Sequence, residues 1–226
     1  VDMSIAEKEN PEDYNSFNAF FTRKLKKNAR KMIIDDDLIL SPVDGVISQV
    51  GYIDKYQLLQ AKNKNYTLEQ LLGGDVDLSD DFLNGCFATL YLSPRDYHRI
   101  HMPTTGRLIK SIYVPGNLFP VNRIGVENVD QLFSRNERFI SIFETQLGLM
   151  AQIMVGAVLV GSMETVWLSE ITPNKKRTLT VTEYTENIIK LNQGEEFGRF
   201  NMGSTVILLF QKEKISWLPD IKKEHP

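Results

Sequence analysis

Runs of β-branched and aromatic residues are the feature that most constrains the fold of this chain. Such runs cover residues 46–53, 87–92, 107–114, 139–143, 150–160 and 205–210. Glycine, proline, asparagine or aspartate punctuates them, as expected of turns between strands. No low-complexity tract or clear repeat interrupts this pattern. We therefore predict a mainly β protein of the α+β class, with a β-sandwich or barrel-like core and a few short helices.

A few short segments have helical patterns instead. Residues 67–72 predict a helix capped by Thr67, and residues 129–133 suggest another. Ser16 is placed to cap a helix near the start of the chain. Its apolar residues recur at helical spacing and share one face: Phe17, Phe20, Phe21 and Leu25.

Composition limits the domain organisation and the class of partner. With 226 residues, 42% of them hydrophobic, the chain is long enough for one good core, and we predict a single domain over residues 1–226. Residues 1–31 read as a helical N-terminal segment. The net charge of −3 gives no general attraction to nucleic acid. No stretch approaches the roughly 20 apolar residues of a membrane-spanning helix.

The N-terminal segment is rich in cations after its phenylalanines. Lysine and arginine crowd residues 23–31. These charges are explained equally well as the solvated end of a helix or as a contact with anionic lipid.

Two histidines lie close together between prolines. His98 and His101 fall within residues 91–103 (YLSPRDYHRIHMP). In a helix they would share a face, and in an irregular segment they would still be free to meet in one cleft. Their spacing differs from the helical zinc motif and no third ligand is evident, so we predict no metal site. Acid–base chemistry is the better interpretation, because imidazole titrates near neutral pH.

Two other segments contain residues with catalytic potential. Asp44 precedes a glycine in residues 41–47 (SPVDGVI), and Ser204 follows Gly203 at the start of an apolar run. Each segment alone would be read as a turn before a strand. Together, Ser204, a histidine and Asp44 are the nucleophile, base and carboxylate that activate a serine hydroxyl. The surroundings of Ser204 lack the Gly-x-Ser-x-Gly pattern of hydrolases. The lone Cys86 lies in an apolar run and reads as a core residue.

These segments resemble the bacterial phosphatidylserine decarboxylases along nearly the whole chain. The family usually has Leu-Gly-Ser-Thr at the last of them, where this chain has Met202, a mild change that conserves volume. The stretches that carry the resemblance are 17–21 (FNAFF), 41–51, 91–103, 113–116 (YVPG), 133–138 (FSRNER), 155–167 and 203–205 (GST).

The resemblance implies an enzyme that cuts itself between Gly203 and Ser204. Asp44 and His101 would activate Ser204, whose oxygen attacks the Gly203 carbonyl and converts the amide to an ester. Elimination and hydrolysis would then leave a pyruvoyl group at residue 204 and release ammonia. The products would be chains 1–203 and 204–226. The pyruvoyl group would form a Schiff base with phosphatidylserine, and His98 would protonate the substrate carbon after carbon dioxide leaves.

The resemblance also implies partners and a location. The two chains would stay together as a heterodimer, with room for further dimerisation, and would act on phosphatidylserine in a membrane. We expect a peripheral protein at the cytoplasmic face of a bacterial inner membrane. Two alternatives remain open. One is a serine hydrolase that uses Ser204, His101 and Asp44 without cleaving itself. The other is a noncatalytic β-rich carrier, suggested by turn-like glycines at residues 194–198.

Overall fold

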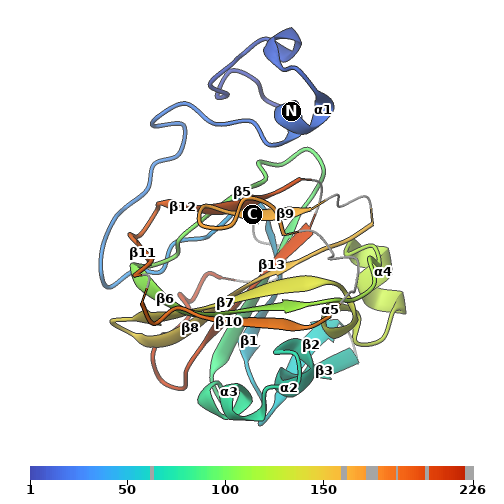
Figure 1. The fold of residues 1–226 in the computed structure, drawn as a ribbon, viewed down its shortest axis with the longest axis vertical. Helices are drawn as coiled ribbons and strands as arrows, with labels where there is room; N and C mark the ends of the chain where they lie inside the picture. Colours follow the sequence, from blue (N-terminus) through green and yellow to red (C-terminus); the bar gives the residue numbers. More distant parts are fainter. Residues whose placement is uncertain (62–63, 159–161, 172–177, 187, 202–203, 222–226) are drawn as a thin grey trace.

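A large antiparallel sheet forms the centre of the molecule. The computed structural model describes residues 1–61, 64–158, 162–171, 178–186, 188–201 and 204–221. Within them, eight strands pair in the order β1-β4-β13-β8-β7-β6-β10, with β11 also on β6 (Figure 1). Their bounds are Val46–Tyr52 (β1), Cys86–Leu92 (β4), Ser204–Phe210 (β13), Gly148–Val155 (β8), Arg138–Thr145 (β7), Gly106–Val114 (β6), Thr180–Glu183 (β10) and Lys190–Leu191 (β11).

Smaller elements cover the two faces of this sheet. A three-stranded sheet lies over one face, and short helices with a two-stranded hairpin lie against the other (Figure 1). The small sheet contains β5 (Arg99–His101), β12 (Glu196–Phe200) and β9 (Met163–Thr165), and the hairpin contains β2 (Gln57–Ala61) and β3 (Lys64–Thr67). The helices are η1 (Pro11–Asp13), α1 (Phe17–Phe21), α2 (Leu68–Leu71), α3 (Val76–Asp81), α4 (Arg123–Asn128) and α5 (Leu132–Arg135).

Strand β13 is buried on both faces, which explains its continuous apolar sequence. Ile207 and Leu209 belong to the core under the helices. Val206, Leu208 and Phe210 belong to the core between the large and small sheets. Alternate side chains of a strand point to opposite faces, so this one strand joins both cores.

The FSRNER segment has a structural explanation. Arg138 is buried, and its guanidinium donates to the carbonyl oxygens of Leu71, Ser134, Asn136 and Gln70. These carbonyls lie at or near the ends of α2 and α5, where helices lack internal partners. Burial lowers the pKa of Arg138 to about 10, which leaves it charged at neutral pH. Arg138 therefore ties both helices to β7.

The mainly β, α+β class is confirmed, and the predicted strand runs all contain strands. The cap at Ser16 is confirmed, since its Oγ accepts from the Ala19 amide at 3.1 Å. Extension of that helix to Leu25 is wrong: α1 ends at Phe21, and Leu25 instead forms a β-bridge with Ala6. The helix predicted at 67–72 forms α2, with a capping box between Thr67 and Gln70.

Two boundaries differ from the sequence-based expectation. The helix expected at 129–133 begins later, at Leu132, after Gln131 adopts a left-handed conformation with φ of 54°. The strand expected over 150–160 ends at Val155, because that residue pairs with Arg138, the first residue of β7. Residues 159–161 of that run lie outside the described part of the chain.

No helix in the described ranges combines the length and apolar character needed to cross a bilayer.

Candidate active site

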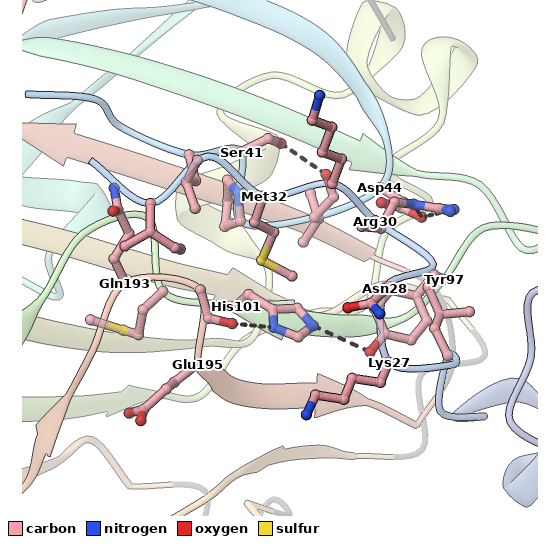
Figure 2. Close-up of a pocket in the computed structure, with 18 of the residues that line it drawn as sticks. Lys27, Asn28, Arg30, Met32, Ser41, Asp44, Tyr97, His101, Gln193 and Glu195 are labelled. Carbon is pink, nitrogen blue, oxygen red and sulfur yellow. Dashed lines mark hydrogen bonds and ion pairs between the residues drawn. The ribbon is translucent and has the colours of Figure 1, made fainter. Parts of the chain in front are cut away.

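A large pocket lies between the N-terminal segment and the body of the protein. Its volume is about 920 Å³. Two of the predicted site residues, Asp44 and His101, line it (Figure 2). The N-terminal segment contributes cations and apolar side chains, whereas the body contributes the polar groups around His101. The lining residues that matter below are Lys27, Arg30, Lys31, Met32, Ile34, Asp44, Tyr97, His101 and Gly194.

His101 is held in a defined tautomer. It ends β5, and its Nδ1 lies 2.9 Å from the carbonyl oxygen of Gly194. A carbonyl only accepts hydrogen bonds, so Nδ1 carries the proton and the lone pair of the neutral ring lies on Nε2. Gly194 sits in a turn with φ of +80°, which glycine adopts without strain. The glycine-rich turn therefore has a role at the site: it presents the carbonyl that orients His101.

Tyr97 occupies the other side of the His101 ring. Its hydroxyl lies 3.2 Å from His101 Nε2, and the two rings stack with centroids 5.8 Å apart (Figure 2). Burial raises the pKa of the Tyr97 phenol, so the hydroxyl stays protonated and donates to Nε2. The pair leaves Nε2 as the basic atom of the pocket.

Asp44 owes its position to the glycine that follows it. A Cβ on Gly45 would lie 2.5 Å from the carbonyl oxygen of Tyr91, so the backbone approaches β4 too closely for any other residue. The Asp44 carboxylate forms an ion pair with Arg30 of the N-terminal segment, and Arg30 Nε donates to Oδ2 at 2.8 Å (Figure 2). The Asp-Gly pair thus fixes a carboxylate at the pocket wall.

Asp44 and His101 face the same pocket without a hydrogen bond between them. The partners of His101 are Gly194 and Tyr97, and the partner of Asp44 is Arg30. In this state the orientation of His101 therefore comes from the turn and the tyrosine. The Asp44 carboxylate is bound to Arg30 instead.

His98 faces away from this pocket. It precedes β5, and an odd spacing from His101 along extended chain puts the two side chains on opposite sides. His98 is fully buried against Phe21, with ring centroids 4.0 Å apart, and its Nδ1 lies 2.9 Å from the Asp96 carbonyl. Its Nε2 has no hydrogen-bond partner among the described residues. Burial lowers the pKa of His98 to about 4, which keeps the ring neutral at pH 7.

The predicted cleavage site follows β12 of the small sheet and coincides with the start of β13 of the large sheet. Gly203 and Met202 fall outside the described residues, as does the side chain of Ser204. The backbone of Ser204 begins β13 and pairs with Leu92, the last residue of β4. On the other side, β12 ends at Phe200, whose amide donates to the His98 carbonyl at 3.0 Å. The strands before and after residues 202–203 are thus bound to His98 and to Leu92, the two ends of residues 92–98.

Asn201 is a site residue that sequence reasoning missed. Its side-chain amide donates to Ser162 Oγ at 2.6 Å and to Glu164 Oε1 at 2.7 Å, and its backbone amide donates to the Ser162 carbonyl. It fixes the chain immediately before residues 202–203. Tyr97, Arg30 and Gly194 were missed as well. Tyr97 lies inside the histidine motif of residues 91–103. The contacts of Asn201, Arg30 and Gly194 join residues far apart in the sequence, so no local sequence pattern indicates them.

No group of three or more histidine, cysteine, aspartate or glutamate side chains gathers as a metal site in the described ranges. Cys86 is buried in β4, and burial raises the pKa of its thiol to about 12. A thiol of this kind stays protonated and packs in the core.

Comparison with known proteins identifies the family. The family model described as phosphatidylserine decarboxylase matches residues 17–224. A phosphatidylserine decarboxylase proenzyme of Pseudoalteromonas translucida is 51% identical over 97% of this chain and 77% of its own. Proenzymes of the same name from Vibrio parahaemolyticus (49%, over 100% of this chain and 79% of theirs) and Coxiella burnetii (50%, over 97% and 78%) are similarly close. The chain therefore belongs to the phosphatidylserine decarboxylase family.

Proposed function

We propose that this chain converts phosphatidylserine to phosphatidylethanolamine and carbon dioxide, with a pyruvoyl group made from its own Ser204. Family membership makes the protein a carboxy-lyase, and the relatives at about 50% identity are named as proenzymes. The observation that carries the proposal is the common pocket of Asp44 and His101, together with the start of β13 at Ser204.

In the proposed first stage, His101 Nε2 takes the proton of Ser204 Oγ as that oxygen attacks the Gly203 carbonyl. The Gly203–Ser204 amide becomes an ester, and the nitrogen of Ser204 becomes a free amine. Elimination breaks the ester to a Gly203 carboxylate and a dehydroalanine, whose hydrolysis releases ammonia and leaves the pyruvoyl group. The Asp44 carboxylate offsets the charge that develops on His101. Support comes from the Gly194 carbonyl, which holds the proton on Nδ1, so that Nε2 keeps the lone pair that accepts from the Tyr97 hydroxyl and can act as the base.

The residues around the cleavage site are compatible with a pyruvoyl group. The orphaned Nε2 of His98 is buried beside the chain segment that contains the cut. When present, the pyruvoyl group supplies an electrophilic carbonyl for the substrate amine and an electron sink for decarboxylation. We propose that His98 delivers a proton to the substrate α-carbon. Since burial keeps this ring neutral at pH 7, an approaching substrate group must first raise its proton affinity.

The first pocket offers surfaces for the rest of the substrate. Lys27 and Lys31 supply positive charge for a phosphodiester, and Met32 and Ile34 supply apolar contacts for the start of the acyl chains. Met32, Ile33 and Ile34 expose 43%, 59% and 61% of their surface beside these cations. A basic segment with exposed apolar side chains favours contact with an anionic membrane. We propose a peripheral location at the cytoplasmic face of the bacterial inner membrane.

We further propose that residues 1–226 form one catalytic domain that is cut into chains 1–203 and 204–226. The two chains remain together as a heterodimer because β13 pairs with β4 and β8, which belong to the larger piece.

The test is turnover by purified protein on phosphatidylserine vesicles, measured as release of carbon dioxide. Treatment with phenylhydrazine, which attacks ketones, is expected to abolish turnover. Ser204→Ala is expected to be inactive and uncut. A serine hydrolase built on Ser204, His101 and Asp44 would release fatty acid, ignore phenylhydrazine and run as one chain. A carrier would do neither reaction. Decarboxylation that resists phenylhydrazine would contradict the proposal.

A further inference from the structure

A second pocket lies between the N-terminal segment and the small sheet. Its volume is about 370 Å³, and it shares no lining residue with the first. Lys8, Arg23 and Lys24 enter it from the N-terminal segment, and Arg99 and Arg199 enter it from β5 and β12. We call these five residues and the space between them the arginine pocket.

The two arginines of the small sheet are already neutralised. Arg99 and Arg199 are opposite each other in the register of β5 and β12, where like charges repel. Arg99 Nη1 donates to both oxygens of Glu196, at 2.7 and 2.9 Å. Arg199 pairs with Glu164 at 2.5 Å. These carboxylates offset the charges of the sheet and leave the charge of the N-terminal segment unbalanced.

Arg23 is the buried cation that the N-terminal segment contributes to this pocket. It exposes 5% of its surface, and its Nε has no hydrogen-bond partner among the described residues. Its guanidinium lies over the Phe20 ring, 5.7 Å from the centroid, and its Nη2 reaches the Arg95 carbonyl at 3.5 Å. No carboxylate in the described ranges forms an ion pair with it. A buried cation without a carboxylate to balance its charge is costly. Burial accordingly lowers the pKa of Arg23.

The lining of the pocket identifies the missing partner as an anion. Glu7 is the one carboxylate among the described lining residues, against three cations without a carboxylate partner: Lys8, Arg23 and Lys24. Guanidinium groups match the oxygen geometry of a phosphate better than other side chains do. We propose that the arginine pocket binds a phosphate group, either free or as the phosphodiester of an anionic lipid headgroup. Phe17, which exposes 65% of its surface on α1 nearby, offers the lipid source an apolar contact.

Such a ligand would connect two parts of the chain. Arg23 belongs to the N-terminal segment, whereas Arg199 lies on the strand that leads through Asn201 to the cleavage site. Asn18 already reaches Asn201 across this boundary at 3.4 Å. A bound phosphate would strengthen the same junction. The inference does not depend on the proposed decarboxylase activity, and binding is measured without turnover.

The first experiment is calorimetric titration of inorganic phosphate into the full chain, at constant ionic strength in chloride. Arg23→Gln and Arg199→Gln remove one guanidinium each from the pocket. Arg107→Gln is the matched control, because Arg107 lies on β6, outside the pocket, and is ion-paired with Glu144 of β7. The wild type and the control are expected to bind alike, and both pocket variants about tenfold more weakly or worse. Circular dichroism checks that each variant is folded. If one pocket variant does not fold, the other alone suffices for the test.

The second experiment separates the two sources. Vesicles of phosphatidylglycerol and of phosphatidylcholine are sedimented with the same four proteins. For a lipid headgroup, binding to phosphatidylglycerol falls in both pocket variants. For free phosphate, all four proteins bind vesicles alike while calorimetry still separates them. No saturable phosphate binding by the wild type, or equal affinity in all four proteins, would overturn the proposal.

Discussion

At the residue scale, the site combines charges and hydrogen bonds that a motif alone does not define. Asp44 and His101 were selected from sequence, and both line one pocket. The contacts that orient them were not predictable, because Gly194 and Arg30 reach them from other parts of the chain. The sequence left open whether the two histidines share a cleft. His101 lines the pocket, whereas His98 is absent from its lining and packs on Phe21.

Asp44 is expected to matter for the cut itself. Asp44→Asn removes the charge that stabilises protonated His101, so self-cleavage should slow by about 10²–10⁴-fold. The measurement is a time course of precursor loss on a denaturing gel after synthesis of the chain. Asp54→Asn is a control, since Asp54 is exposed and outside the pocket. Cleavage of Asp44→Asn at the wild-type rate would remove Asp44 from the mechanism.

His98 is expected to matter for turnover and not for the cut. His98→Ala should process normally but decarboxylate about 10²–10⁴-fold more slowly per mole of pyruvoyl group, the usual contribution of a general acid. Phe21→Leu serves as a control that changes the packing on His98 and keeps the imidazole. Normal turnover by His98→Ala would leave the residue with a packing role, and failure to self-cleave would assign it to the first stage.

The same histidine predicts a pH dependence of stability. Its pKa is about 4 in the folded protein against an ordinary value of 6.5, so the unfolded chain binds more protons between these values. The contribution of neutral His98 to the free energy of unfolding is complete above pH 6.5 and declines as the pH falls towards 4. The free energy of unfolding should drop by about 2 kcal/mol from this group between pH 7 and pH 5. Urea denaturation of wild type and His98→Gln measures it, and parallel pH profiles of the two would refute it.

At the scale of elements, long strands were predictable and short ones were not. β1, β4, β6, β7 and β13 coincide with apolar runs because each packs against a core. β5 and β9 have three residues each, too few for a periodic pattern, and exist because β12 pairs with both. The end of β8 at Val155 reflects where its neighbour begins, which local sequence does not encode.

Strand β13 is expected to hold the two chains together after cleavage. Its buried side chains each contribute about 1.5–3 kcal/mol, so the cut protein should elute as one species without denaturant. Leu209→Ala should cost about 2–5 kcal/mol and lower the urea concentration at which the chains separate. Lys212→Ala, at an exposed position beyond the strand, should leave it unchanged. Separation of the wild-type chains in plain buffer would contradict this role of β13.

At the scale of the whole molecule, the expected cut falls where the chain passes from the small sheet to the large one. β12 belongs to the small sheet and β13 to the large one, and the expected cut falls between them. Each product therefore keeps strands whose pairing survives the loss of one peptide bond. The N-terminal segment lies above the small sheet and contributes to both pockets (Figure 1).

The intact mass of the purified protein under denaturing conditions tests the central claim most directly. Two components are predicted: residues 1–203 with a free carboxylate, and residues 204–226 lighter by one ammonia than a peptide that begins with serine. Ser204→Ala should give one uncut chain. A wild-type protein that is active in decarboxylation and has the mass of the single 226-residue chain, 25.9 kDa, would contradict the account.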